Sequence, residues 1–220
     1  MTPDHIVLGL AWFLVFLFST TLHEAAHAFT AYRLGDPTAY EGGQVTLNPL
    51  PHIRREPFGM ILVPLITFAT MGWMMGWASA PYDPAWAHRY PRRAALMALA
   101  GPVANFFLVI VAGVAIRGGI ATGLFQQGGL MAGAAMPLSI LFSLNLLLGV
   151  FNLLPLPPLD GSAIVPAFMS PAMIQRYNAF LHQPMLSLLG LMVAWKVFPW
   201  IFQPIEAFAI RLLYAGLPLR

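Results

Sequence analysis

Long apolar runs separated by short polar stretches are the feature that most limits how this chain can fold. Several runs approach the roughly 20 residues that an α-helix needs to cross the hydrocarbon core of a bilayer. Only 9% of the residues are charged and the mean hydropathy is +0.73, whereas soluble domains carry about 25% charged residues. So few charges cannot cover a water-facing surface. We therefore expect an integral membrane protein.

The apolar runs predict an all-α polytopic membrane protein with about five to six hydrophobic segments. No linker, repeat or low-complexity tract divides the chain, so residues 1–220 are expected to form one membrane-embedded domain. Its core is expected at about 6–165, followed by C-terminal helices at about 184–217. The expected segments are 6–34, 58–80, 94–116, 135–154, 185–202 and the interfacial-looking 204–217.

A polar stretch at residues 35–57 follows the first segment. Within it, residues 43–47 alternate between polar and apolar side chains, which predicts a short β element after the first span. The formal net charge of the chain is only +3. In a membrane protein such a small excess reports the topology of the loops and does not indicate nucleic-acid binding.

The segment 58–80 contains Pro64, Gly72 and Gly76. These residues permit a re-entrant path, which enters and leaves the bilayer on one side where protein shields its backbone. Seven arginines then share one side of the membrane and Arg117 lies on the other. The positive-inside rule places the arginine-rich side in the cytoplasm. The seven are Arg33, Arg54, Arg55, Arg89, Arg92, Arg93 and Arg176.

The first segment carries His23-Glu24-Ala25-Ala26-His27 in its second half. Residues i and i+4 lie on one face of an α-helix, so both imidazoles can reach a single metal ion. Glu24 lies about 100° around the helix from His23, where a carboxylate can accept a proton from a metal-activated water. A chance HExxH match in a chain of this composition has a probability of roughly 0.3%.

The position of this motif inside a membrane span strengthens the interpretation as a metal site. Ionisable side chains within a span are costly and usually face a partner, a cavity or a bound ion. Three of them within five residues have no lipid-facing explanation. Ser19 and Thr20 lie one turn earlier and extend the same polar stripe.

A catalytic metal site usually has a third protein ligand and one open position. Asp160 stands out among the acids, because it follows the fourth segment and a Pro155-Leu156-Pro157-Pro158 run that cannot continue the helix. Gly161 permits a close backbone approach or an unusual dihedral directly afterwards. By position alone, Asp160 is either the third ligand or a solvated aspartate in a turn.

Three motifs occur together: His23-Glu24-x-x-His27, the run from Ala100-Gly101-Pro102 to Asn105, and the run from Asn152 to Asp160-Gly161. With them, roughly residues 15–165 resemble the site-2 protease family of intramembrane zinc metalloproteases, in particular its short prokaryotic branch. The resemblance implies cleavage of peptide bonds in or near transmembrane segments of membrane-protein substrates.

The resemblance also implies one Zn²⁺ ion held by His23, His27 and Asp160, with Glu24 as the general base. We expect a multi-pass protein of the cell membrane, in contact with the lipid bilayer and a membrane-protein substrate. Because water must reach the metal from the arginine-rich side, we expect the active site nearer the cytoplasmic face. Ligand type alone does not exclude iron or cobalt in place of zinc.

Two asparagines are further candidates for catalysis. Asn152 is implied to contact the substrate or the developing oxyanion, and Asn105 is a second candidate for that role. The sequence departs from the branch pattern at Arg54, where an acidic residue is usual, and at Ser79, where lysine is usual. Both positions flank the expected substrate entrance, so substrate choice stays open.

Two other function classes are compatible with the same ligands. A membrane metal transporter generally needs polar residues along several spans, whereas the ionisable residues here gather at one depth. A proteolytically silent scaffold does not require Glu24, which is present. The sequence therefore favours the protease over both alternatives.

Overall fold

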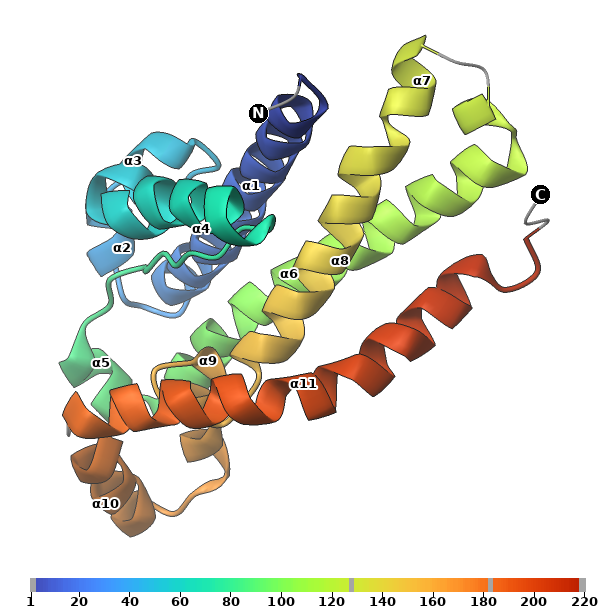
Figure 1. The fold of residues 1–220 in the computed structure, drawn as a ribbon. Helices are drawn as coiled ribbons and strands as arrows, with labels where there is room; N and C mark the ends of the chain where they lie inside the picture. Colours follow the sequence, from blue (N-terminus) through green and yellow to red (C-terminus); the bar gives the residue numbers. More distant parts are fainter. Residues whose placement is uncertain (1–2, 127–128, 182–183, 218–220) are drawn as a thin grey trace.

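A computed structural model describes residues 3–126, 129–181 and 184–217. Four helices dominate the described chain, and each is long and apolar enough to cross a membrane. They are α1 (Pro3–Arg33), α6 (Pro91–Ala121), α8 (Ala135–Asn152) and α11 (Pro184–Tyr214) (Figure 1). The shorter elements are α2 (Thr38–Glu41), α3 (Pro49–Arg55), η1 (Phe58–Leu62), α4 (Val63–Met71), α5 (Pro84–Arg89), η2 (Leu124–Gln126), α7 (Gly129–Gly133), α9 (Asp160–Ile164), η3 (Val165–Phe168) and α10 (Pro171–Leu181).

The all-α membrane class is confirmed. The predicted count of five to six hydrophobic segments is not supported, because the described residues contain four candidate spans and one shorter apolar helix, Phe58–Met71. The expected segments 185–202 and 204–217 are joined in one helix, α11, which runs to Tyr214 because neither Pro199 nor Pro204 ends it. Proline has a helix-compatible φ and removes one donor, and membrane helices tolerate that loss.

The predicted β element at residues 43–47 is also wrong. This stretch forms a turn and bends, and none of the described residues lies in a strand with which it could pair. Asn48 instead caps α3, since its side-chain oxygen accepts a hydrogen bond from the N–H of Leu50 at 3.0 Å. Pro49 follows in the first turn, a position that proline favours. Local capping decides the structure here.

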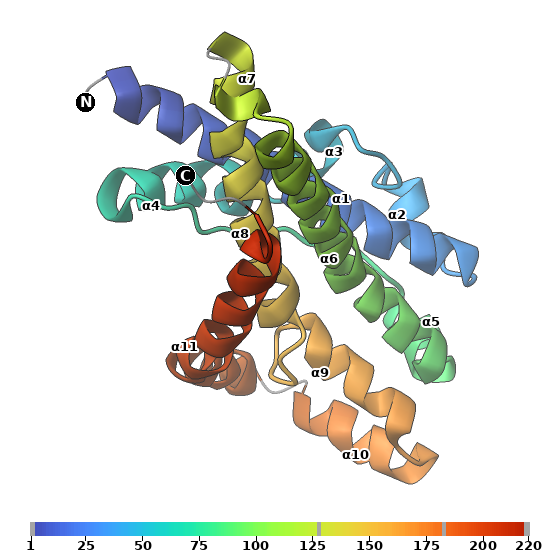
Figure 2. The same cartoon turned by 90° about the vertical axis from the view of Figure 1, so that its right-hand side faces the viewer.

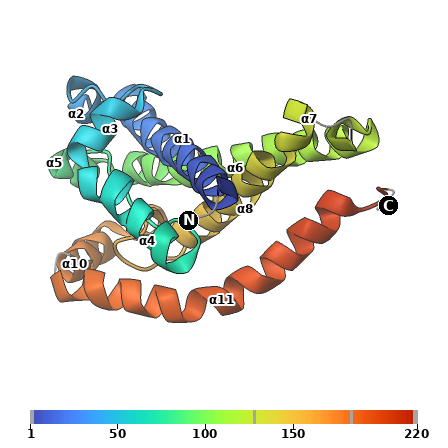
Figure 3. The same ribbon diagram turned by 45° about the horizontal axis from the view of Figure 1, so that its top comes forward.

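The centre of the bundle consists of α6 and α8, which lie side by side and run in opposite directions (Figures 1 and 2). α1 packs on both of them, and α11 passes along the other side of α8 (Figure 3). The apolar core joins Ala112 of α6, Phe142 and Leu146 of α8, and Ala194 and Phe198 of α11. The two alanines are fully buried, which lets the helices approach closely.

The segment between α1 and α6 turns back on itself. Its apolar helix covers only Phe58–Met71, which is shorter than a bilayer crossing requires. Gly72 ends the helix with a φ of +79°, a conformation that glycine adopts without strain. The chain then returns, and the N–H of Trp77 donates to the carbonyl oxygen of Gly59 at 3.2 Å. A Cβ on Gly76 would lie 2.2 Å from that oxygen, so only glycine fits.

The end of α1 and the start of α6 lie together at one end of the bundle. The guanidinium of Arg93 donates to the carbonyl oxygen of Leu34 at 3.1 Å, and Trp86 packs with Ala31 in one cluster. Residues 34–90 therefore begin and end at the same level. This geometry agrees with a re-entrant path, which stays a prediction.

The absence of cysteine from the chain allows a direct test of this topology. Single cysteines replacing the exposed residues Glu41 and His88 should react with a membrane-impermeant maleimide from the same side of sealed vesicles. A cysteine replacing the exposed Thr122, beyond the end of α6, should react only from the opposite side. Labelling of the Glu41→Cys and His88→Cys variants from opposite sides would rule out the re-entrant path.

Candidate metal centre

His23 and His27 lie near the C-terminal end of α1 and face α6. Both side chains are buried, and the centroids of their rings lie 4.6 Å apart in an edge-to-face arrangement. The two Nε2 atoms are only 3.0 Å from each other. Glu24, also buried, follows His23 directly.

Hydrogen bonds to the opposite side of each ring determine what the Nε2 atoms can do. Nδ1 of His27 lies 2.7 Å from the carbonyl oxygen of Met97, which can only accept, so Nδ1 carries the proton and donates. Nδ1 of His23 lies 2.6 Å from Oδ1 of Asn105. A neutral imidazole that donates from Nδ1 holds a lone pair on Nε2. Two such lone pairs facing each other repel unless a cation lies between them.

Asp160 completes the constellation from the first residue of α9. Its Oδ2 lies 3.1 Å from Nε2 of His23 and 3.3 Å from Nε2 of His27. The three ligand atoms all lie within 4.8 Å of one another, and this buried Oδ2 has no hydrogen-bond donor among the described residues. Three electron-rich atoms that converge on one point, with one orphaned oxygen, fit a divalent metal ion.

The same neighbours govern the charge of Asp160. Burial by itself raises the pKa of this carboxyl group, but the attraction of positive charge at His27 and His23 outweighs burial and holds the pKa well below its usual range. Any positive charge held between the three groups therefore keeps Asp160 ionised, which is the state that coordinates a metal.

The turn between α8 and α9 places Asp160 by tight backbone contacts. A Cβ on Gly161 would lie 2.3 Å from the carbonyl oxygens of Leu153 and Leu154. Only glycine therefore lets the backbone at this position pack so closely against the end of α8. Ser162 Oγ donates to the carbonyl oxygen of Leu159 at 2.7 Å.

Helix α10 also stabilises the region around Asp160, through a hydrogen bond to α9. The Tyr177 hydroxyl donates to the carbonyl oxygen of Ser162 at 2.9 Å. Burial raises the pKa of Tyr177, so this phenol remains a donor at neutral pH.

Gly101 of α6 forms the floor beneath the two imidazoles. A Cβ at this position would lie 2.3 Å from Nε2 of His27 and 2.5 Å from Nε2 of His23. Any larger residue would push both rings away from Asp160. Gly101 belongs to a motif that resembles a family motif in the sequence. Its lack of a side chain leaves room for the two imidazole rings.

A cleft of about 470 Å³ opens beside these groups. It is bounded by side chains of the metal centre, by a non-helical stretch after α4, by the start of α6 and by η3. Among its lining residues are Glu24, His27, Ala78, Ser79, Ala80, Tyr82, Pro91, Asp160 and Pro166. Glu24, His27 and Asp160 therefore border this cleft.

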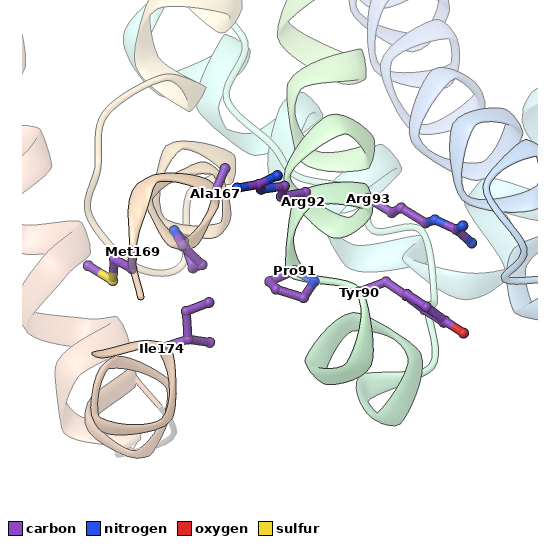
Figure 4. Close-up of a pocket in the computed structure, with 8 residues that line it drawn as sticks. Tyr90, Pro91, Arg92, Arg93, Ala167, Met169 and Ile174 are labelled. Carbon is purple, nitrogen blue, oxygen red and sulfur yellow. The ribbon is translucent and has the colours of Figure 1, made fainter. Parts of the chain in front are cut away.

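A second cavity of about 390 Å³ adjoins the cleft and shares Pro91 and Pro166 with it (Figure 4). Arg92 extends toward Ala167 on its wall, whereas Arg93 points away from it. Arg93 lies over the ring of Tyr90, 4.5 Å from the ring centroid.

The two asparagines predicted for catalysis lie elsewhere. Asn152 is the last residue of α8, is half-buried and does not line the cleft. Asn105 is fully buried beneath His23, and its Nδ2 donates to Oδ1 of Asn145 at 2.8 Å. Asn145 belongs to none of the sequence motifs. The signal that identifies it is a polar amide in the middle of an 18-residue apolar helix, the same kind of signal that identified the histidines.

Comparison with known proteins agrees with this geometry. The model of peptidase family M50 matches residues 11–193. The chain belongs to peptidase family M50. M50 is the site-2 protease family, so the resemblance predicted from the motifs is confirmed. No solved structure matches the chain with significance.

Several curated relatives of this M50 chain are named as zinc metalloproteases. YwhC of Bacillus subtilis is 39% identical over 154 residues, which cover 70% of this chain and 66% of YwhC. Rip2 of Mycobacterium tuberculosis strain H37Rv is 33% identical over 189 residues, covering 84% of this chain and 68% of Rip2. Rip2 of Mycolicibacterium smegmatis is 31% identical over 157 residues, covering 70% and 56%. The chain thus spans somewhat over half to about two thirds of these relatives.

The floor under the imidazoles yields a prediction. Gly101→Ala should reduce the affinity for Zn²⁺ by about tenfold or more, because small displacements of ligands and their supports typically have effects of that size. Gly118→Ala is the matched control, since it adds the same methyl group to the same helix where no atom lies within 4 Å. Competition with a chromophoric chelator measures both affinities. Equal affinities would show that the floor does not restrain the imidazoles.

Proposed function

We propose that this chain is a membrane zinc metalloprotease in which His23, His27 and Asp160 hold one Zn²⁺ ion and Glu24 is the general base. The observation that carries the proposal is the convergence of three ligand atoms within 4.8 Å, one of them without a donor, beside a glutamate that lines a cleft. Membership of a peptidase family and the names of the relatives support it.

The donor set suits zinc. Two imidazole nitrogens and one carboxylate oxygen are typical of catalytic zinc sites, which keep a fourth position open. Iron and cobalt accept the same ligand types, and the names of the relatives favour zinc among the three.

The chemistry divides between the metal and Glu24. A bound zinc ion supplies Lewis acidity, which polarises the substrate carbonyl and lowers the pKa of a water molecule. Glu24 accepts a proton from that water as its oxygen adds to the carbonyl carbon. Glu24 then donates the proton to the leaving amine as the C–N bond breaks, and so returns to its ionised state.

The oxyanion contacts predicted for Asn105 and Asn152 receive no support from their positions. The amide of Asn105 faces Asn145, and Asn152 lies outside the cleft lining. Substrate contact by Asn152 stays a prediction for the complex with a bound peptide.

The proposed substrates are membrane proteins cut in or near a transmembrane segment. Both histidines belong to a helix able to span the membrane, which supports a site at membrane depth. A helical substrate must unwind locally to expose a peptide bond. Along the cleft, residues 78–82 have no backbone–backbone hydrogen bonds within the described part of the chain. Their N–H and C=O groups are therefore available to an unwound, extended substrate.

The proposed location is the cell membrane, with the active site nearer the cytoplasmic face. The metal centre lies toward the end of the bundle where α1 ends and α6 begins, and Arg33, Arg92 and Arg93 are at this end. Arg117 lies at the other end, where it donates to carbonyl oxygens of the last turn of α11. This asymmetry supports a cytoplasmic orientation under the positive-inside rule.

The two alternative functions receive less support. A metal transporter needs a path of coordinating groups, but in the described residues the groups able to share a metal form one cluster, His23, His27 and Asp160. A silent scaffold has no use for a buried glutamate next to the ligands, and Glu24 lies there.

Glu24→Gln tests the proposed mechanism. The variant should lose cleavage of single-span membrane substrates by at least about 10²-fold, because a general base contributes roughly that much. It should keep the zinc content of the wild type, since Glu24 is not a ligand. Glu41→Gln, an exposed change in α2, is the matched control. Equal cleavage by Glu24→Gln and wild type would refute the assignment of Glu24 as the general base.

Asp160→Asn tests the ligand set by a different readout. Removing the charge of the orphaned Oδ2 should lower the affinity for Zn²⁺ at least about tenfold, and cleavage should fall with it. Asp4→Asn, at the exposed start of α1, should change neither. Wild-type zinc binding by Asp160→Asn, measured in detergent by metal analysis after dialysis, would remove Asp160 from the site.

A further inference from the structure

A chain of hydrogen bonds crosses the interior of the bundle from α8 through α6 to His23. Nδ2 of Asn145 donates to Oγ of Ser19 and to the carbonyl oxygen of Leu141, both at 2.8 Å. Nδ2 of Asn105 donates to Oδ1 of Asn145 at 2.8 Å, and Oδ1 of Asn105 lies 2.6 Å from Nδ1 of His23. Ser19, Asn105 and Asn145 are all 0% exposed.

The donor-to-acceptor direction of this series of hydrogen bonds is fixed at Leu141, the end remote from His23. The carbonyl oxygen of Leu141 can only accept, so the amide of Asn145 must turn its NH₂ group toward Leu141. Its Oδ1 then faces Asn105, whose NH₂ group must donate to it. The Oδ1 of Asn105 is thereby left for His23. Nδ1 of His23 must carry the proton, and Nε2 presents its lone pair to the metal centre.

We propose that Asn105 and Asn145 are positioning residues that set the tautomer and the ring orientation of His23 for metal binding. The inference rests on the proposed zinc site and goes beyond it, because Asn145 touches no metal ligand directly. It acts by holding the amide of Asn105 in the one orientation that accepts from His23. A reversed Asn105 amide would present an N–H to Nδ1 and favour the opposite tautomer, whose Nε2 cannot coordinate.

The two histidines are therefore held by different means. His27 is fixed by a backbone carbonyl, that of Met97, and no side-chain substitution removes this acceptor. His23 depends on two side chains from two other helices. Changes in the asparagine pair should consequently weaken the metal centre through His23 alone.

A structural role makes a different prediction from a positioning role. If the asparagines only link α6 to α8, any change that removes the donor of Asn105 should be equally harmful. Asn105→Asp and Asn105→Leu both remove the NH₂ group that donates to Asn145. Only Asn105→Asp keeps an oxygen that accepts from Nδ1 of His23. A carboxylate is a common acceptor behind a metal-bound histidine.

The experiment measures Zn²⁺ affinity by chelator competition on the full-length protein in detergent, together with the visible spectrum of the Co²⁺-loaded protein. Asn105→Leu should lower the affinity about 10–100-fold and alter the Co²⁺ spectrum, as loss of a partner behind a ligand typically does. Asn105→Asp should stay within a few-fold of the wild type. Asn145→Leu should lower the affinity about tenfold, since the Asn105 amide becomes free to reverse.

Ser19→Ala is the matched control within the same hydrogen-bond chain. Leu141 alone still orients Asn145, so the affinity should remain within about twofold of the wild type. Equal losses in Asn105→Asp and Asn105→Leu would overturn the proposal in favour of helix linkage. Wild-type affinity in Asn145→Leu would overturn it as well, and this arm decides the matter if Asn105→Leu does not fold. Absence of Zn²⁺ binding by the wild type would instead refute the proposed function on which the inference rests.

Discussion

The bundle is organised around the mutual approach of three electron-rich atoms, the Nε2 atoms of His23 and His27 and Oδ2 of Asp160, at 3.0 to 3.3 Å. Without positive charge between them these atoms repel, and burial removes the water that would weaken the repulsion. A shared cation converts the repulsion into attraction between α1 and α9. The proposed metal centre would thus cross-link the first span and the turn that follows α8, two parts of the chain far apart in sequence.

The remaining geometry follows from bringing these groups together inside apolar surroundings. α6 supplies a small residue, Gly101, where the rings need space, and hydrogen-bond acceptors, from Met97 and Asn105, where their far nitrogens need partners. α8 ends at Asn152, a proline-rich turn follows, and the short α9 begins at Asp160. The non-helical residues after α4 leave one side of the centre open as a cleft.

Sequence reasoning identified the membrane class, and His23, Glu24 and His27 stood out because ionisable residues inside an apolar run are costly unless they have a function. Asp160 stood out because it follows a proline-rich run after the fourth segment, and the family resemblance implied it as a ligand. Sequence reasoning failed where the outcome depended on tertiary partners. The alternating residues 43–47 have no neighbouring strand, and the capping of α3 by Asn48 prevails. Proline signals also misled at α11, because Pro204 removes one donor without breaking the helix. Hydrogen-bond partners such as Asn145 carry no spacing signal relative to the motif.

One face of α6 carries Met97, Gly101 and Asn105 at intervals of four residues. The carbonyl of Met97 contacts His27, Gly101 lies against both histidines, and Asn105 contacts His23. A slide of α6 by one residue along its axis, about 1.5 Å, would misplace all three contacts at once. The register of α6 against α1 therefore sets all three of these contacts with the proposed metal ligands together.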